Sequence, residues 1–87
     1  MEVGASLRYD GGMATLRQQF GRRLRALRKQ AGFSQESLAE RASMSVDFVS
    51  LVERGINAPS FESLERLGKA LGKQVADLFR FTDEPED

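Results

Sequence analysis

The chain reads GFSQESLAERASMSVDFVSLVERG from Gly32 to Gly55. Each of the two apolar runs in this stretch follows a serine, whose hydroxyl can accept from the unpaired N–H groups of a helix's first turn. The spacing predicts two short helices, the first over Gln35–Arg41 and the second from Ser45 to about Arg54, joined by a tight turn. The glycines at both ends of the stretch are typical helix terminators, because glycine readily adopts the left-handed conformation.

Both predicted helices carry their hydrophobic residues on one side. Leu38 and Ala39 point inward from the first helix, while Phe48, Val49 and Val52 do so from the second. A helix as short as the first is marginal alone and needs neighbours to pack against. Helical geometry turns the other residues of the second helix away from the core, namely Val46, Asp47, Ser50, Leu51 and Arg54.

The flanking sequence predicts three more helices. Apolar residues at three- and four-residue steps indicate a long helix that ends at Gly32, and they are Met13, Leu16, Phe20, Leu24, Leu27 and Ala31. A second stripe lies between the expected cap Ser60 and the terminator Gly72, and it comprises Phe61, Leu64, Leu67 and Leu71. A short last helix is marked by Val75, Leu78 and Phe79, with Phe81 just beyond. Five helices and no candidate strand predict an all-α bundle.

Composition narrows the classes of function. The 87 residues, 40% of them hydrophobic, suit one small domain. The sequence lacks cysteine, histidine and any glycine-rich phosphate loop, so we expect a non-enzymatic protein without metal or cofactor. No apolar run approaches the roughly 20 residues of a membrane span, and no signal peptide is evident. We therefore expect a cytoplasmic protein with no membrane partner.

Charge is unevenly distributed, although the net charge is zero. Residues 1–30 hold seven basic and two acidic side chains, which leaves +5, and the rest of the chain holds −5. Four of the acidic residues lie in the last five positions, so that the chain without them is +4. We expect a flexible arm over 1–12, a folded domain over 13–81 and a solvated acidic tail over 82–87.

Four motifs in register resemble the Cro/C1-type helix-turn-helix family, also called the XRE family, which includes lambdoid phage repressors and restriction-modification controller proteins. The resemblance covers 20–79, about two thirds of the chain. The motifs are Phe20-Gly21-x-x-Leu24-Arg25-x-Leu27-Arg28; Gly32-Phe33-Ser34-Gln35-Glu36-x-Leu38-Ala39; Val49-Ser50-x-Val52-Glu53-Arg54-Gly55; and Asn57-x-Pro59-Ser60 with Leu64, Leu67, Ala70-Leu71-Gly72 and Leu78-Phe79. The resemblance implies a five-helix lambda-repressor-like domain.

The resemblance implies that the helix from Ser45 lies in the major groove of double-stranded DNA. It makes Gln35 a phosphate contact, since an amide beside unpaired helix N–H groups can bind a phosphate oxygen; the alternative is that Gln35 is only a good helix former. The implied base-facing residues are Val46, Asp47 and Leu51, and the implied phosphate contacts are Ser45, Ser50 and Arg54. Asn57 is a further candidate, because its side-chain amide can donate to a phosphate. An arm that grips DNA through Arg8 is an alternative to a disordered one.

These residues depart from the family pattern in two ways. Base readers are more often Arg, Gln, Asn or Lys, whereas Val46 and Leu51 can only pack on a thymine methyl and Asp47 can accept from a cytosine amino group. The loop Ile56–Ala58 also lacks the cation that related proteins often place there. The alternative for the outward face is an ordinary solvated or protein-binding surface.

Two further expectations concern structure and assembly. The resemblance implies an ion pair between Arg28 and Glu53 that ties two helices together. A homodimer is expected because one short helix reads too few base pairs. The candidate dimer surface consists of Val75, Leu78, Phe79 and Phe81, although Val75 and Leu78 can instead pack beneath the preceding helix.

The sequence thus predicts a dimeric, sequence-specific transcriptional regulator, a repressor or autoregulator on an inverted-repeat operator. It would act by positional competition or by contact with RNA polymerase. The alternative is a protein-interaction module or antitoxin-like accessory subunit that uses the same scaffold to dock a protein partner.

Overall fold

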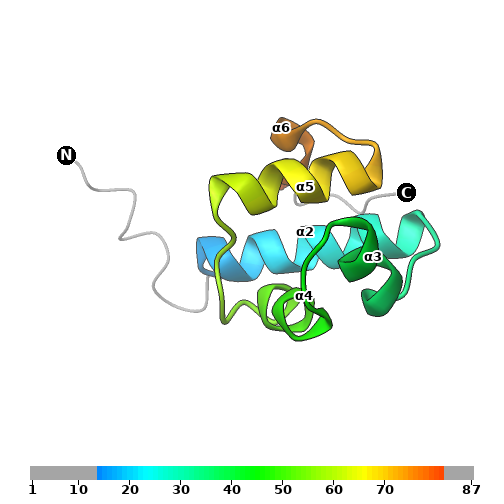
Figure 1. The fold of residues 1–87 in the computed structure, drawn as a ribbon. Coiled ribbons are helices and arrows are strands. Elements are labelled where there is room, and N and C mark those ends of the chain that lie inside the picture. The colour runs from blue at the N-terminus through cyan, green and yellow to red at the C-terminus, as the bar shows by residue number, and fades with distance from the viewer. Residues whose placement is uncertain (1–13, 82–87) are drawn as a thin grey trace.

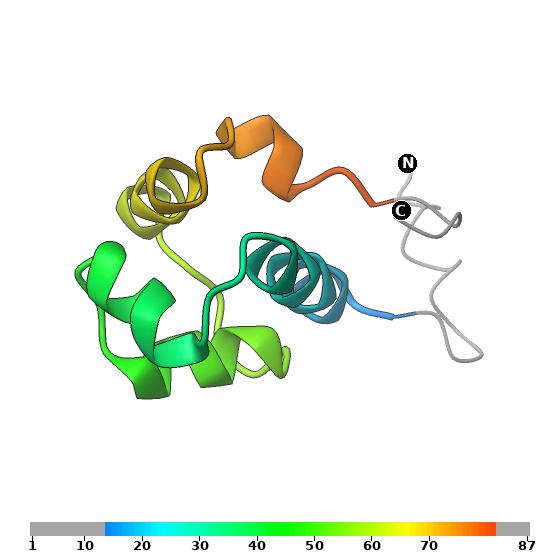
Figure 2. The same ribbon diagram turned by 90° about the vertical axis from the view of Figure 1, so that its right-hand side faces the viewer.

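The computed structural model describes residues 14–81, which contain five helices and no strand. They are α2 (Leu16–Gln30), α3 (Gln35–Arg41), α4 (Val46–Glu53), α5 (Phe61–Leu71) and α6 (Val75–Leu78). Figure 1 shows α5 above α2, with α3 and α4 below. Figure 2 views α2 and α5 nearly end-on, with α6 on the side opposite α3 and α4. The predicted all-α fold is confirmed, and no helix of this part of the chain is both long and apolar enough to cross a membrane.

The helix boundaries follow from local capping. Ser34, Ser45 and Ser60 each accept a backbone N–H three residues on, as predicted, at 3.0, 3.0 and 3.1 Å. Gly72 ends α5 in the left-handed conformation with φ 69°, and Gly32 does the same after α2 with φ 81°. These interactions depend on near neighbours in the chain, which explains why the sequence could predict them.

The start of α2 was predicted three residues too early. A capping box at Thr15 begins the helix at Leu16: the Thr15 hydroxyl accepts from the backbone N–H of Gln18 and the Gln18 side chain accepts from that of Thr15. The first residue expected in this helix, Met13, lies outside the described residues.

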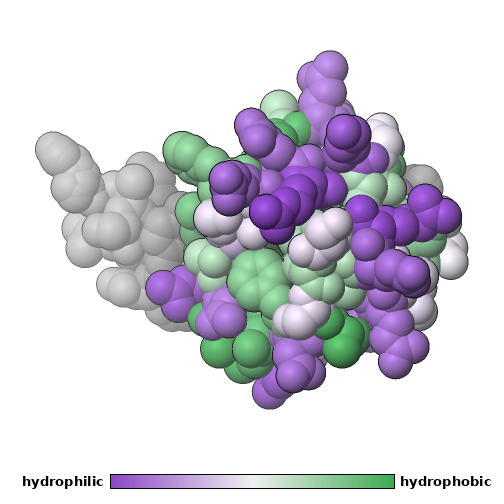
Figure 3. Space-filling model, in the orientation of Figure 1, coloured by the Kyte–Doolittle hydropathy of each residue, from purple (hydrophilic) through white to green (hydrophobic). Residues whose placement is uncertain are grey.

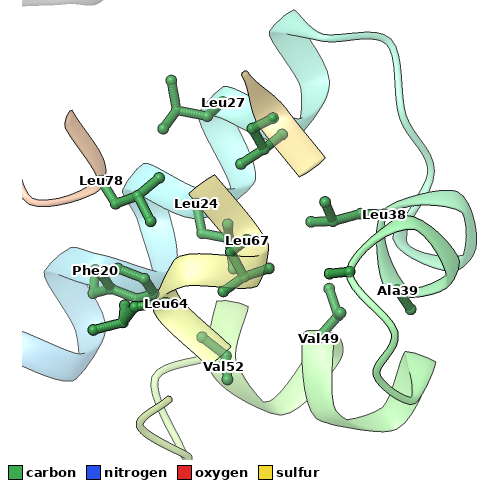
Figure 4. Close-up of a cluster of buried hydrophobic side chains, with 12 residues drawn as sticks. Phe20, Leu24, Leu27, Leu38, Ala39, Val49, Val52, Leu64, Leu67 and Leu78 are labelled. Carbon is green, nitrogen blue, oxygen red and sulfur yellow. The ribbon is translucent and has the colours of Figure 1, made fainter. Parts of the chain in front are cut away.

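One core is formed by all five helices. Figure 4 shows side chains from each helix converging on a single cluster, whose members are Phe20, Leu24, Leu27, Leu38, Ala39, Ala42, Val49, Val52, Leu64, Leu67, Leu71 and Leu78. Phe48 and Val75 are half-buried and pack against this cluster. The faces predicted for α3 and α4 are therefore the ones that point inward.

The core is smaller than the periodicity predicted. Leu16 is 61% exposed and Phe61 85% exposed, although both were expected on inward stripes. Each stands at the first position of its helix, one turn before the first buried residue of that helix, Phe20 or Leu64. Ala31 is likewise an exposed C-cap. Periodicity identifies the side of a helix that faces the core, whereas the extent of the core is set by neighbouring helices.

Candidate nucleic-acid interface

A four-residue turn sets the angle between α3 and α4. It runs from the C-cap Ala42 to the N-cap Ser45. The residue after Ala42, Ser43, has a positive φ of 58°, which is uncommon for a residue with a side chain. The N–H of Met44 donates to the carbonyl of Ala39 at 2.9 Å, and the Met44 side chain packs on the core. These contacts anchor the turn to the body of the domain.

The side of α4 that faces away from the core is exposed to different degrees along its length. Val46 is 38% exposed, Asp47 and Arg54 are exposed, and Ser50 and Leu51 are half-buried. In Figure 3, strongly hydrophobic residues lie along the lower part of one face, where α4 lies, with hydrophilic residues between them, while the upper part over α5 is mainly hydrophilic. The exposed side of α4 therefore has a mixed apolar and acidic character, with Arg54 after its last turn.

A buried ion pair joins α2 to α4. The Nε of Arg28 donates to Oε2 of Glu53 at 2.6 Å and its Nη2 to Oε1 at 3.1 Å, while its Nη1 donates to the carbonyl of Phe33 at 2.8 Å. The side chains of Arg28 and Glu53 are only 9% and 3% exposed. This bidentate geometry is the arrangement in which a guanidinium and a carboxylate interact most strongly.

Gln35, at the start of α3, joins the same network. Its Nε2 donates to Oε1 of Glu53 at 3.0 Å, an interaction that the sequence did not predict. A primary amide carries two N–H groups and an acceptor oxygen, so Gln35 can hold Glu53 and still contact a second group. Glu53 thus fixes the beginning of α3 relative to α4.

The loop after α4 is held by two elements. The N–H groups of Ile56 and Asn57 both donate to the carbonyl of Leu51, at 2.9 and 3.3 Å. From α2, the Nη1 of Arg17 donates to the carbonyl of Ile56 at 3.1 Å. Asn57 is half-buried and Arg17 is exposed. The contact could not be predicted from the sequence, because Arg17 lies 39 residues from Ile56 and no motif links the two.

The candidate dimer surface is an aromatic cluster at the end of the described chain. The ring centroid of Phe79 lies 5.0 Å from that of Phe20 and 6.0 Å from that of Phe81. Phe79 is 37% exposed, whereas Val75 and Phe81 are half-buried. Leu78 is completely buried in the core of the single chain, which removes it from the candidate dimer surface because it has no exposed area left to cover.

Comparisons with known proteins agree with this arrangement of helices. A model of the family described as a helix-turn-helix domain matches residues 19–81. The control protein C.BamHI of Bacillus amyloliquefaciens is 38% identical over 64 residues, 72% of this chain and 79% of that protein. The immunity repressor protein of Bacillus phage phi105 is 39% identical over 58 residues, 67% of this chain and 40% of that protein, so the chain spans less than two thirds of that repressor. The crystal structure of the restriction-modification controller protein C.AhdI from Aeromonas hydrophila matches with a TM-score of 0.71 and 38% identity over 72% of this chain and 96% of that chain.

Proposed function

Because this chain belongs to the helix-turn-helix domain family, as its motifs predicted, we propose that it is a sequence-specific DNA-binding transcriptional regulator that binds an inverted-repeat operator as a dimer. The observation that carries the proposal is the exposed side of α4, on a helix whose Val49 and Val52 are completely buried on the opposite side. The major groove of B-DNA is wide enough to admit such a helix. One side of α4 is thus packed on the core, and the opposite side is accessible to DNA.

In the proposed complex, the exposed side of α4 divides its contacts between bases and phosphates. Val46 and Leu51 pack on thymine methyl groups, and the Asp47 carboxylate accepts from the amino group of a cytosine. The phosphate contacts come from Ser45, Ser50, Arg54 and Asn57, which offer hydroxyl, guanidinium or amide N–H donors. The Ser45 hydroxyl oxygen already accepts from the backbone N–H of Phe48 at 3.0 Å, and its O–H remains a donor.

Gln35 completes the phosphate contacts from the start of α3. Its bond to Glu53 holds the amide in one orientation before DNA arrives. A donor that is already oriented loses less side-chain entropy on binding than a freely rotating one. Glu53 therefore supports the interface without touching DNA.

We place the dimer interface at the aromatic cluster around Phe79 and Phe81, with Val75 beside it. Phe79 is more than one third exposed although its ring lies against Phe20. A second copy that covered this surface would bury aromatic area, which stabilises association. Two half-sites about 34 Å apart would then be read by the two copies of α4.

The regulatory role follows from binding. A dimer whose operator overlaps a promoter excludes RNA polymerase by competition, and one beside a promoter can contact polymerase. The names of the relatives, a control protein and an immunity repressor, support a repressor or autoregulator. We propose that it acts in the cytoplasm. We propose no catalytic activity, since the sequence has neither histidine nor cysteine.

One observation favours a second candidate function. Val46 is 38% exposed and Leu51 is only half-buried, so the outward side of α4 offers apolar area of the kind that protein interfaces use. A protein-interaction module or antitoxin-like accessory subunit would dock its partner there.

Selection of bound duplexes from a random DNA library tests the proposal. We expect an inverted repeat to be enriched and to bind at least roughly a thousandfold more tightly than scrambled DNA. Asp47→Ala is expected to alter the selected sequence, while Glu65→Ala, an exposed acidic change on α5, is expected to leave it unchanged. Absence of enrichment would contradict sequence-specific binding and favour the second candidate.

A further inference from the structure

The loop after α4 contains no cation of its own. Between Arg54 and Arg66 the sequence holds neither lysine nor arginine. The structure nevertheless places a guanidinium on this loop, because Nη1 of Arg17 lies 3.1 Å from the carbonyl oxygen of Ile56. We infer that Arg17 is a DNA phosphate-binding residue, supplied from α2 in place of the missing loop cation. This inference rests on the proposed function.

The backbone around Arg17 is held close to the loop. A Cβ added to Gly55 would stand 2.9 Å from Cγ and 3.1 Å from Cα of Gln18, the residue after Arg17. One turn further along α2, a Cβ on Gly21 would stand 2.5 Å from the carbonyl oxygens of both Val52 and Glu53. The first two turns of α2 thus lie directly against the end of α4 and the beginning of the loop. The same loop is anchored to Leu51, one of the proposed base-facing residues.

The chemistry of Arg17 suits a second acceptor. A guanidinium has five N–H donors in a planar fork, and the bond to Ile56 uses one of them. Arg17 is exposed, and planar guanidinium groups bind phosphate oxygens in bidentate fashion. The first turn of α2 contains no acidic residue that would neutralise it. The bond to Ile56 orients the side chain toward the loop that also carries Asn57.

A purely structural role for Arg17 makes a different prediction. If it only clamped the loop, its charge would be irrelevant, and an amide that can still donate to the Ile56 carbonyl would largely replace it. A phosphate contact depends on the charge and releases counterions, so its loss lowers the salt dependence of binding. Arg17→Gln removes the charge, and Arg17→Lys keeps it.

The test measures dissociation constants of the full chain at several salt concentrations, on the selected operator and on a random-sequence duplex. We expect Arg17→Gln to weaken binding to both duplexes by a similar factor and to reduce the slope of log K against log salt by about one per protomer. Arg17→Lys should retain the slope. Arg22→Gln is the matched control. Arg22 is also exposed on α2, but it lies about 140° from Arg17 around the helix axis.

The possible outcomes separate this inference from the proposed function. An unchanged slope for Arg17→Gln, in a variant that melts like the wild type, would overturn the phosphate contact while leaving sequence-specific binding intact. If the wild type binds only non-specifically but with an Arg17-dependent slope, the phosphate contact stands and sequence specificity fails. If the wild type binds neither duplex, both proposals are wrong. If Arg17→Gln melts at a lower temperature than the wild type, Arg17→Lys decides the outcome. A salt slope that equals the wild-type slope in Arg17→Lys but not in Arg17→Gln supports the phosphate contact. A reduced slope in both variants counts against it.

Discussion

Gly21 on α2 lies so close to Glu53 on α4 that a Cβ at position 21 would stand 2.5 Å from the Glu53 carbonyl oxygen. No side-chain rotation can relieve such an overlap, because the atom approached belongs to the backbone. In the sequence, Gly21 is notable only as part of the motif that begins at Phe20. The structure gives the physical reason for a glycine there: α2 and α4 meet at the distance of backbone contact.

Gly21→Ala is therefore expected to destabilise the domain by about 1–3 kcal/mol, the usual cost of overpacking, despite the better helix propensity of alanine. Denaturant unfolding followed by circular dichroism measures the change. Gly32→Ala is the control, because a Cβ there would meet nothing within 4 Å and the cost comes from its φ of 81° alone. A stability for Gly21→Ala equal to that of the wild type would contradict the close approach.

Removing one partner of the buried ion pair is expected to be costly. Glu53→Gln leaves the Arg28 charge only 9% exposed and without a countercharge, which corresponds to a loss of about 3–5 kcal/mol. The matched control is Glu62→Gln, which removes the exposed pair with Arg66 at 3.9 Å and should change stability by less than about 1 kcal/mol. Similar losses of stability in Glu53→Gln and Glu62→Gln would show that burial does not determine how much the pair between Arg28 and Glu53 stabilises the domain.

The contacts proposed for Leu51 predict sensitivity to one methyl group. Replacing a contacted thymine of the selected operator by deoxyuridine removes the C5 methyl, and we expect about a fourfold loss of affinity for each contacted methyl. In Leu51→Ala, the same DNA change should have little effect at the position that Leu51 reads. Equal sensitivity of the wild type and the variant at every thymine would exclude Leu51 as a base-facing residue.

The dimer surface predicts a change in self-association. Phe79→Ala and Phe81→Ala should each weaken the dimer, measured by sedimentation at micromolar concentrations. Phe61→Ala is the control for loss of an exposed aromatic ring, since Phe61 is 85% exposed at the start of α5. If Phe61→Ala weakened the dimer and the other two did not, the interface would lie at the start of α5.

The sequence predicted those parts of the fold that depend on near neighbours in the chain. The bounds of α3 and the caps at Ser45 and Ser60 agree with the structure, because each cap involves residues three positions apart. Phe61 was assigned to the core incorrectly, since periodicity does not reveal where the neighbouring helices end. The loop contact of Arg17 could not be predicted at all, because it depends on how α2 packs against the end of α4.

In the candidate site too, contacts between residues far apart in the chain could not be predicted from local sequence. The ion pair between Arg28 and Glu53 was expected only from the family resemblance, and the geometry now accounts for it with two hydrogen bonds. The bond from Gln35 to Glu53 was not expected, although Gln35 had been singled out for a different partner. A residue type and its position in a helix indicate what it can donate, but not which acceptor lies within reach.

The backbone contact at Gly21 has a consequence for the DNA. With the helices meeting main chain to main chain, α4 has little freedom to tilt when it enters a groove, so a dimer would hold its two copies of α4 at a fixed distance and angle. A duplex whose natural twist or curvature differs must then bend or twist to receive both copies. The base pairs between the half-sites would influence affinity through their stiffness although no side chain touches them. We expect the dimer to bind an operator with flexible pyrimidine–purine steps in that spacer more tightly than one with a stiff A-tract there.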